Sequence, residues 1–241
     1  MLRIKEDHAL LNEPSRRRIS SFDPSLWPAD DKFRALRSLP IDGRLSAPSG
    51  SGRDTQSEEL SWDAISAEPA TYFNLGKGEE KRYTIIPDGH IAKQLDLDVY
   101  FVKRQSSRLL VVFHGALDRN KFYLPRFEYK RSLKDFKGSI LFVQDPTLYT
   151  HDRLTLGWYV GNYLDNGHAM VEHLVRAIAQ AMEPTKILMV GSSGGGFAAM
   201  AISARIPGSE ALAFSPQTSI EKYHVGHRQR LISAAFPEMR P

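Results

Sequence analysis

One serine flanked by glycines has the surroundings that covalent chemistry requires. Residues 191–195 read Gly-Ser-Ser-Gly-Gly, which is the pattern Gly-x-Ser-x-Gly centred on Ser193. An apolar run precedes this segment and small, apolar residues follow it through Ile206, so the context is strand, turn and helix. Such a turn strains the backbone of the central serine, and larger flanking residues would collide with the strand and helix. We therefore expect Ser193 to be a nucleophile held out at the end of a sheet.

The elements that must position this serine alternate between strand and helix patterns. Apolar residues recur at helical spacing over residues 168–183, where Asn166 or Asp165 can cap the start and Pro184 ends the helix. The pattern predicts an α/β fold, with a mainly parallel sheet flanked by helices and ligands at the carboxyl ends of its strands. We expect strands at 82–86, 97–103, 109–113, 140–143, 187–190 and 211–214, the last four buried on both faces.

The turn and a second motif together resemble the α/β-hydrolase superfamily over roughly residues 80–220. The strand at 109–113 is followed by His-Gly-Ala at residues 114–116, similar to the segment that carries the superfamily's oxyanion loop. The resemblance implies that the backbone N–H of Gly194, with that of Gly115 or Ala116, faces a developing oxyanion. It implies for His114 a structural role beside the backbone.

Three short phrases give a looser resemblance. Asp-Pro-Thr at 145–147, Gly-Trp-Tyr at 157–159 and Phe-Ser-Pro-Gln at 214–217 are similar to phrases of hydrolase-like proteins associated with bacterial capsule and surface-glycan biosynthesis. The resemblance implies an esterase or acyltransferase that acts on a small-molecule or glycan ester.

The catalytic base and its acid are harder to place. In the superfamily an acid and then a histidine follow the nucleophile, and here Glu221 and His227 are the nominal acid and base. The alternative is that both belong to a polar surface segment. Residues 228–236 have the pattern of a short helix, and no strand-length apolar run follows residue 217. The superfamily's last strands are therefore missing from the expected sheet, which leaves the fold incomplete.

Two other functions fit parts of the sequence. An incomplete sheet would have an open edge, so the chain could be an inactive or truncated hydrolase-like scaffold that binds a partner protein. Residues 194–199 also satisfy Gly-x-Gly-x-x-Ala, a dinucleotide-binding fingerprint. That motif needs an acidic residue at the end of the next strand, where this chain has Ser215-Pro216-Gln217.

Composition excludes several classes of protein. The 241 residues contain no cysteine, which rules out a disulfide scaffold and thiolate metal sites. The net charge of +4 is spread along the chain and is too small to indicate nucleic-acid binding. No run of apolar residues is long enough for a signal peptide or a membrane span. We expect a soluble cytoplasmic protein with no metal and no cofactor.

The chain divides near residue 60. Residues 46–59 are rich in Ser, Gly and Pro and contain no large apolar side chain, which is typical of a linker. Residues 1–60 are predicted to be an extension, with one amphipathic helix at 29–39, and residues 61–241 the hydrolase-like domain.

Two further predictions concern ring side chains. His168 and His173 lie on the predicted helix and are expected to be exposed to solvent. Tyr149, Trp158, Tyr159 and Tyr163 fall in a long loop, where they could line a sugar or acyl pocket or cover the sheet.

Overall fold

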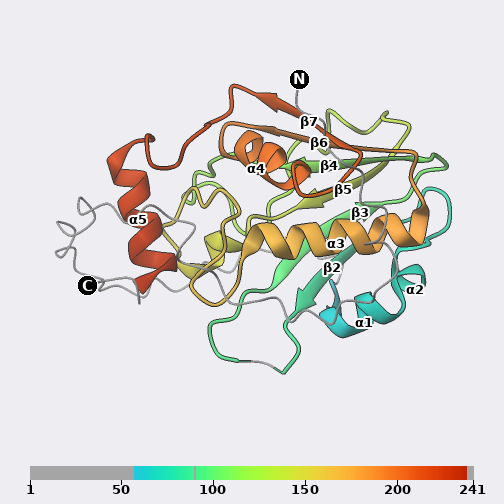
Figure 1. Cartoon of the computed structure of the whole chain (residues 1–241), viewed down its shortest axis with the longest axis horizontal. Helices are drawn as coiled ribbons and strands as arrows, with labels where there is room; N and C mark the ends of the chain where they lie inside the picture. Colours follow the sequence, from blue (N-terminus) through green and yellow to red (C-terminus); the bar gives the residue numbers. More distant parts are fainter. Residues whose placement is uncertain (1–56, 90, 238–241) are drawn as a thin grey trace, which may run out of the picture.

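A seven-stranded sheet forms the centre of the molecule (Figure 1). The structure, a computed structural model, describes residues 57–89 and 91–237. The strands lie in the order β1-β2-β3-β5-β4-β6-β7, and β3 alone runs antiparallel to its neighbours. The predicted α/β class with a mainly parallel sheet is confirmed. The strands are β1 (Glu58–Ser61), β2 (Glu80–Ile86), β3 (Leu97–Val102), β4 (Arg108–Phe113), β5 (Ser139–Val143), β6 (Lys186–Ser192) and β7 (Ser209–Phe214).

The two faces of the sheet are covered differently. Four helices share a large apolar core with one face, whereas the long connection between β4 and β5 covers the other with Phe127, Leu133 and Phe136. Figure 1 shows α5 apart from these helices, beyond the end of β7. The helices are α1 (Trp62–Ala67), α2 (Pro69–Phe73), α3 (Gly167–Met182), α4 (Gly194–Ser203) and α5 (Val225–Ala235), with a 3₁₀ helix η3 (Pro146–Thr150).

The longest helix, α3, confirms the sequence pattern that predicted it. The side chain of Asn166 accepts a hydrogen bond from Ala169 N at its start, so Asn166 is the cap. At the other end Glu183 adopts a left-handed conformation directly before Pro184. The side chains that it buries are spaced as one helical face: Met170, Val171, Leu174, Val175, Ala177 and Ile178.

The strand β7 corrects one expectation. Residues 211–214 were expected to be buried on both faces, yet Leu212 is 45% exposed and Phe214 54% exposed. The reason is position: β7 is an edge strand that pairs only with β6 among the described residues. The interior strand β4 has the same apolar character, and all its residues after Arg108 are buried. An apolar run therefore predicts a strand here. How far the strand is buried depends on whether it has neighbouring strands on both sides.

Some boundaries differ from the predicted ones. The sheet begins at Glu58, inside the stretch assigned to the extension, because β1 pairs with β2 from Glu58 to Ser61. The helix predicted at 228–236 begins three residues earlier as α5. The helix predicted at 29–39 lies outside the described residues.

Candidate active site at the turn between β6 and α4

Ser193 lies at the junction of β6 and α4, in a strained backbone conformation. Its φ is 55° and its ψ is −121°, a region that side chains with a Cβ rarely occupy. Three backbone hydrogen bonds hold it there. Ser193 N donates to Phe214 O at 3.0 Å, and Ser193 O accepts from Phe197 N at 3.1 Å and Gln217 N at 3.3 Å. The predicted strand–turn–helix with a strained central serine is present.

The neighbouring glycines allow the backbone to pass at close range. A Cβ on Gly191 would overlap the carbonyl group of Gly195. A Cβ on Gly195 would lie 2.6 Å from the carbonyl oxygens of both Phe113 and His114. Such distances do not occur for real side chains, so α4 can begin against the end of β4 only with glycines at these positions. The turn thereby meets the loop that follows β4.

That loop passes directly beside the serine. A Cβ on Gly115 would lie 3.6 Å from the Ser193 Cβ and 3.2 Å from the Ser192 carbonyl oxygen. Among the described residues, neither Gly115 N nor Ala116 N donates a backbone hydrogen bond, whereas Leu117 N donates to Thr155 O. Gly194 is the first residue of α4, and the first N–H groups of a helix have no acceptor within it. Free N–H groups thus lie on either side of Ser193.

His114 fastens this loop to the strand end. Its Nε2 accepts a hydrogen bond from Asp145 N at 3.0 Å, so its Nδ1 carries the proton and donates to Gly115 O at 2.8 Å. Burial lowers the pKa of His114 to about 4. A neutral ring with both nitrogens occupied is no base for Ser193. The structural role that the resemblance implied is what these contacts give.

Asp145 organises the loop on the other side of His114. Its carboxylate accepts hydrogen bonds from Thr147 N at 3.0 Å and Gly157 N at 3.1 Å, and burial raises its pKa to about 6. Tyr159 joins the same network: its hydroxyl donates to Val143 O and accepts from His114 N. These contacts fix the segment that carries Trp158.

Gln217 is the side chain that forms a hydrogen bond with the Ser193 hydroxyl. Its Nε2 lies 2.6 Å from Ser193 Oγ, and its Oε1 accepts a hydrogen bond from Trp158 Nε1 at 2.8 Å. No sequence pattern assigned Gln217 a catalytic role. Its position after β7 was a usable signal, since ligand-binding residues gather at the carboxyl ends of strands. The contact itself depends on the register that sets Phe214 opposite Ser192.

The predicted acid and base lie further along the same segment. Glu221 is exposed, and the ring of His227 packs 5.6 Å from that of Tyr223, which in turn lies 5.6 Å from Trp158. Among the described residues, neither Glu221 nor His227 forms a hydrogen bond to Ser193. Burial, followed by the nearby Arg230 and His224, lowers the pKa of His227. Contacts through Tyr223 and Trp158 thus connect His227 to Gln217.

His168 corrects a second expectation, because the residue is partly buried rather than exposed. Its Nε2 donates to Trp158 O at 2.9 Å, and burial lowers its pKa to about 4. Helical periodicity put His168 on the polar side of α3, whereas the loop that folds over the start of α3 covers it. His173, also expected to be exposed, packs its ring against Trp62 and forms a hydrogen bond with Ser66.

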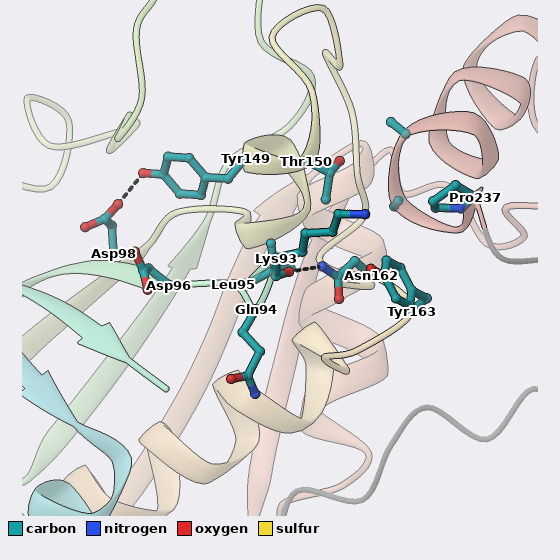
Figure 2. Close-up of a pocket in the computed structure, with 12 residues that line it drawn as sticks. Lys93, Gln94, Leu95, Asp96, Asp98, Tyr149, Thr150, Asn162, Tyr163 and Pro237 are labelled. Atoms are coloured by element: carbon teal, nitrogen blue, oxygen red, sulfur yellow. Dashed lines mark hydrogen bonds between the residues drawn. The ribbon is translucent and has the colours of Figure 1, made fainter. Parts of the chain in front are cut away.

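The four loop aromatics fall into two groups. Trp158 and Tyr159 are buried, while Tyr149 and Tyr163 line a cavity of about 380 Å³ (Figure 2). In Figure 2 the Tyr149 hydroxyl points at Asp98, to which it donates a hydrogen bond, and Asn162 Nδ2 donates to Lys93 O at 2.8 Å. Ser193 is not part of the cavity wall. Two further polar side chains of the wall are paired with backbone, Thr150 with Thr147 O and Gln94 with Ile91 N.

Two properties of the described residues bear on other functions. They contain no group of three or more His, Cys, Asp or Glu side chains that could hold a metal ion. Within the same ranges, no helix combines the length and apolarity needed to cross a membrane.

A scan against protein-family models found no match, and a search of curated proteins found none either. Solved structures that resemble the chain include the capsule O-acetyltransferase of Neisseria meningitidis serogroup A, at 18% identity and a TM-score of 0.45 over 61% of this chain and 62% of that one. The esterase Pf2001 of Pyrococcus furiosus follows at 16% identity and a TM-score of 0.43, over 60% and 55%. An acetyl xylan esterase from Aspergillus awamori aligns at 12% identity and a TM-score of 0.36, over 56% and 50%.

In each of these comparisons the aligned region spans less than two thirds of the other protein. Within this chain, the mixed sheet and the strand–serine–helix turn give an α/β-hydrolase-like fold.

Proposed function

We propose that the chain is a serine-dependent esterase or acyltransferase with Ser193 as its nucleophile. The observation that carries this proposal is the backbone of Ser193, at φ 55° and ψ −121° between β6 and α4. Holding a residue with a Cβ in that region costs on the order of 1–3 kcal/mol, and such strain is concentrated at functional sites. A turn that only connected a strand to a helix would have no need of a serine there.

The proposed reaction is acyl transfer through a covalent intermediate. The Ser193 hydroxyl gives its proton to a base as Oγ attacks the ester carbonyl, and the carbonyl electrons move onto oxygen. The N–H of Gly194 and that of Gly115 or Ala116 would bind this oxyanion, one on either side of Ser193. This tetrahedral intermediate collapses to an acyl-enzyme as the leaving group departs with the proton. Attack by water or by an acceptor hydroxyl on the acyl group then frees Ser193.

For the base we keep His227, with Glu221 as its acid. A lowered pKa leaves His227 neutral at neutral pH, which is the state that can accept a proton. Its position supports the proposal, because the contacts run from His227 through Tyr223 and Trp158 to Gln217. For catalysis the start of α5 has to bring His227 to Ser193 Oγ. Loss of labelling at Ser193 in His227→Ala, but not in His224→Ala, would support this assignment.

The acceptor is proposed to be a glycan hydroxyl. Its support is the similarity of residues 145–147, 157–159 and 214–217 to hydrolase-like proteins of surface-glycan biosynthesis. A small acyl ester would be the donor. Incubating the protein with an activated acetyl ester and polysaccharide fragments, then measuring O-acetyl groups on the glycan, distinguishes transfer from simple hydrolysis.

Labelling with a fluorophosphonate probe tests the nucleophile directly. Such probes react with serine hydroxyls that an enzyme has activated. We expect label on the wild-type protein and none on Ser193→Ala, with both variants unfolding at similar temperatures. Absence of label on a folded wild-type protein would rule out the proposed function.

A second candidate function is that of a non-enzymatic scaffold. It is favoured by the contact of Ser193 Oγ with an amide rather than a base, and by the exposed Leu212 and Phe214 on the edge strand β7. An open strand edge of this kind can pair with another chain. A scaffold would co-purify with a partner and show no turnover of p-nitrophenyl acetate. Turnover that depends on Ser193 would exclude it.

A further inference from the structure

Gln217 and Ser193 are joined through both main chain and side chain. Gln217 N donates to Ser193 O at 3.3 Å, while Gln217 Nε2 donates to Ser193 Oγ at 2.6 Å. Ser193 N also donates to the carbonyl of Phe214, three residues before Gln217. The segment that follows β7 therefore has a fixed position relative to the nucleophile.

Trp158 fixes the orientation of the Gln217 amide. The indole N–H can only donate, so the group facing it at 2.8 Å must be the amide oxygen. If the amide were turned over, its NH₂ would face the indole N–H, and two donors would oppose each other. Trp158 is fully buried and cannot swing away from this contact. The amide NH₂ is therefore the group presented to Ser193.

This orientation determines what Ser193 Oγ can do. Oγ accepts a hydrogen bond from Gln217, and its own proton must point in another direction, where a base or a water can take it. An amide has no basic nitrogen, so Gln217 cannot remove the proton itself. It can stabilise the oxygen that remains, since a hydrogen bond to the charged form of a group favours ionisation.

We propose that Gln217 is a catalytic residue that stabilises the developing negative charge on Ser193 Oγ, and that Trp158 is a positioning residue that holds its amide in the donating orientation. This inference rests on the proposed role of Ser193 as nucleophile. The donor is in place before the reaction, so no reorganisation is needed as charge forms. The same hydrogen bond acts again when Oγ leaves the acyl group during deacylation.

The rate of fluorophosphonate labelling, measured against pH, tests the proposal. In that reaction Oγ bonds to phosphorus as fluoride leaves, and the serine proton goes to a base. Gln217→Ala removes the donor, and we expect labelling to be slower by about 100-fold. Thermal unfolding of the same samples establishes that the variant is folded. Labelling of Gln217→Ala at the wild-type rate would overturn the proposal.

Gln217→Glu separates hydrogen-bond donation from shape, because the two side chains have nearly the same size. When ionised, the carboxylate cannot donate and repels the forming alkoxide, so labelling should be far slower than in wild type. When protonated, the carboxyl can donate as the amide does. The ratio of the variant rate to the wild-type rate should therefore rise as pH falls. A ratio that is constant with pH would mean that Gln217 has only a structural role, and would overturn the proposal.

Two tryptophan variants test the positioning role. Trp158→Phe removes the N–H that orients the amide, and we expect labelling about 10-fold slower, since the amide can then turn its oxygen toward Oγ. Trp62→Phe makes the same substitution at another buried tryptophan, in α1, and should label at the wild-type rate. Equal rates for both variants would exclude a role for Trp158.

The outcomes also separate this inference from the function on which it rests. A folded wild-type protein that takes no label would remove the nucleophile, and the inference with it. Labelling of Ser193 at the same rate in wild type and in the Gln217 variants would overturn the inference but leave the proposed function standing.

Discussion

The two sides of the Ser193 site are built from opposite kinds of structure. The side that carries Ser193 comes from the interior strands β4 and β6 and from α4, where the apolar side chains are buried or partly buried. The other side comes from the segment after β7, an edge strand whose Leu212 and Phe214 are exposed. The packing of β4, β6 and α4 fixes the position of Ser193. Hydrogen bonds fix the position of the segment after β7 that faces it. Both sides hold a serine at positive φ, Ser193 at 55° on the first and Ser215 at 41° on the second.

The largest effect should follow from changing the strained residue itself. Ser193→Gly removes the nucleophile, so label and ester turnover should be lost by at least about three orders of magnitude. Glycine adopts positive φ without penalty, so the free energy of unfolding should rise by about 1 kcal/mol. Activity assays and chemical denaturation measure the two effects. A fall in stability would show that Ser193 is not strained as its angles indicate.

One substitution made on both sides measures the difference in packing. Leu109 in β4 is buried, and Leu109→Ala should cost about 2–5 kcal/mol of unfolding free energy. Leu212 in β7 is 45% exposed, and Leu212→Ala should cost less than about 1 kcal/mol. Urea denaturation of the two variants gives the comparison. A large loss for Leu212→Ala would mean that something covers β7 in solution.

Two glycines allow a finer test of backbone proximity. Gly195→Ala places a methyl group 2.6 Å from two carbonyl oxygens, and should cost about 1–3 kcal/mol and slow labelling at Ser193. Gly226→Ala in α5 meets nothing within 4 Å and should be neutral or stabilise by up to about 1 kcal/mol. Thermal unfolding measured in parallel checks both values. Equal stabilities would show that α4 does not depend on the close approach of Gly195.

Acidification should lower the free energy of unfolding through the histidines whose pKa is lowered by burial. His168 has a pKa near 4 when folded and near 6.5 when unfolded, so the unfolded chain binds more protons between these values. Stability therefore falls as pH drops through that window, by about 1 kcal/mol per histidine between pH 6.5 and 5.5. Asp145, whose pKa is raised to about 6, has the opposite effect over an overlapping range.

Comparing variants isolates the histidine, because Asp145 is common to both proteins. His168→Gln should reduce the loss of unfolding free energy between pH 6.5 and 5.5 by about 1 kcal/mol. The measurement is urea unfolding at the two pH values, and an unchanged slope in His168→Gln would contradict the assigned burial.

Sequence patterns sufficed where a local rule determines the outcome. The run at 109–113 gave β4, Asn166 gave the start of α3, and the glycines around Ser193 gave the turn. They failed where the outcome depends on parts of the chain far apart in sequence. Periodicity placed His168 on an exposed face, yet the loop carrying Trp158 covers it. The role of Gln217 required two contacts, to residues 24 and 59 positions away.

The hydrogen bonds of His114 bear on which N–H, that of Gly115 or that of Ala116, would bind the oxyanion of the proposed reaction. A trans peptide points its C=O and N–H in opposite directions. The His114 carbonyl faces the position of a Cβ on Gly195, so the N–H of Gly115 is turned away from the start of α4. The Gly115 carbonyl is bound to His114 Nδ1, so the N–H of Ala116 is turned away from His114. His114, with both ring nitrogens hydrogen-bonded, thus holds the peptide plane between Gly115 and Ala116 in place, and in the proposed reaction the N–H of Ala116 is the donor that it leaves free.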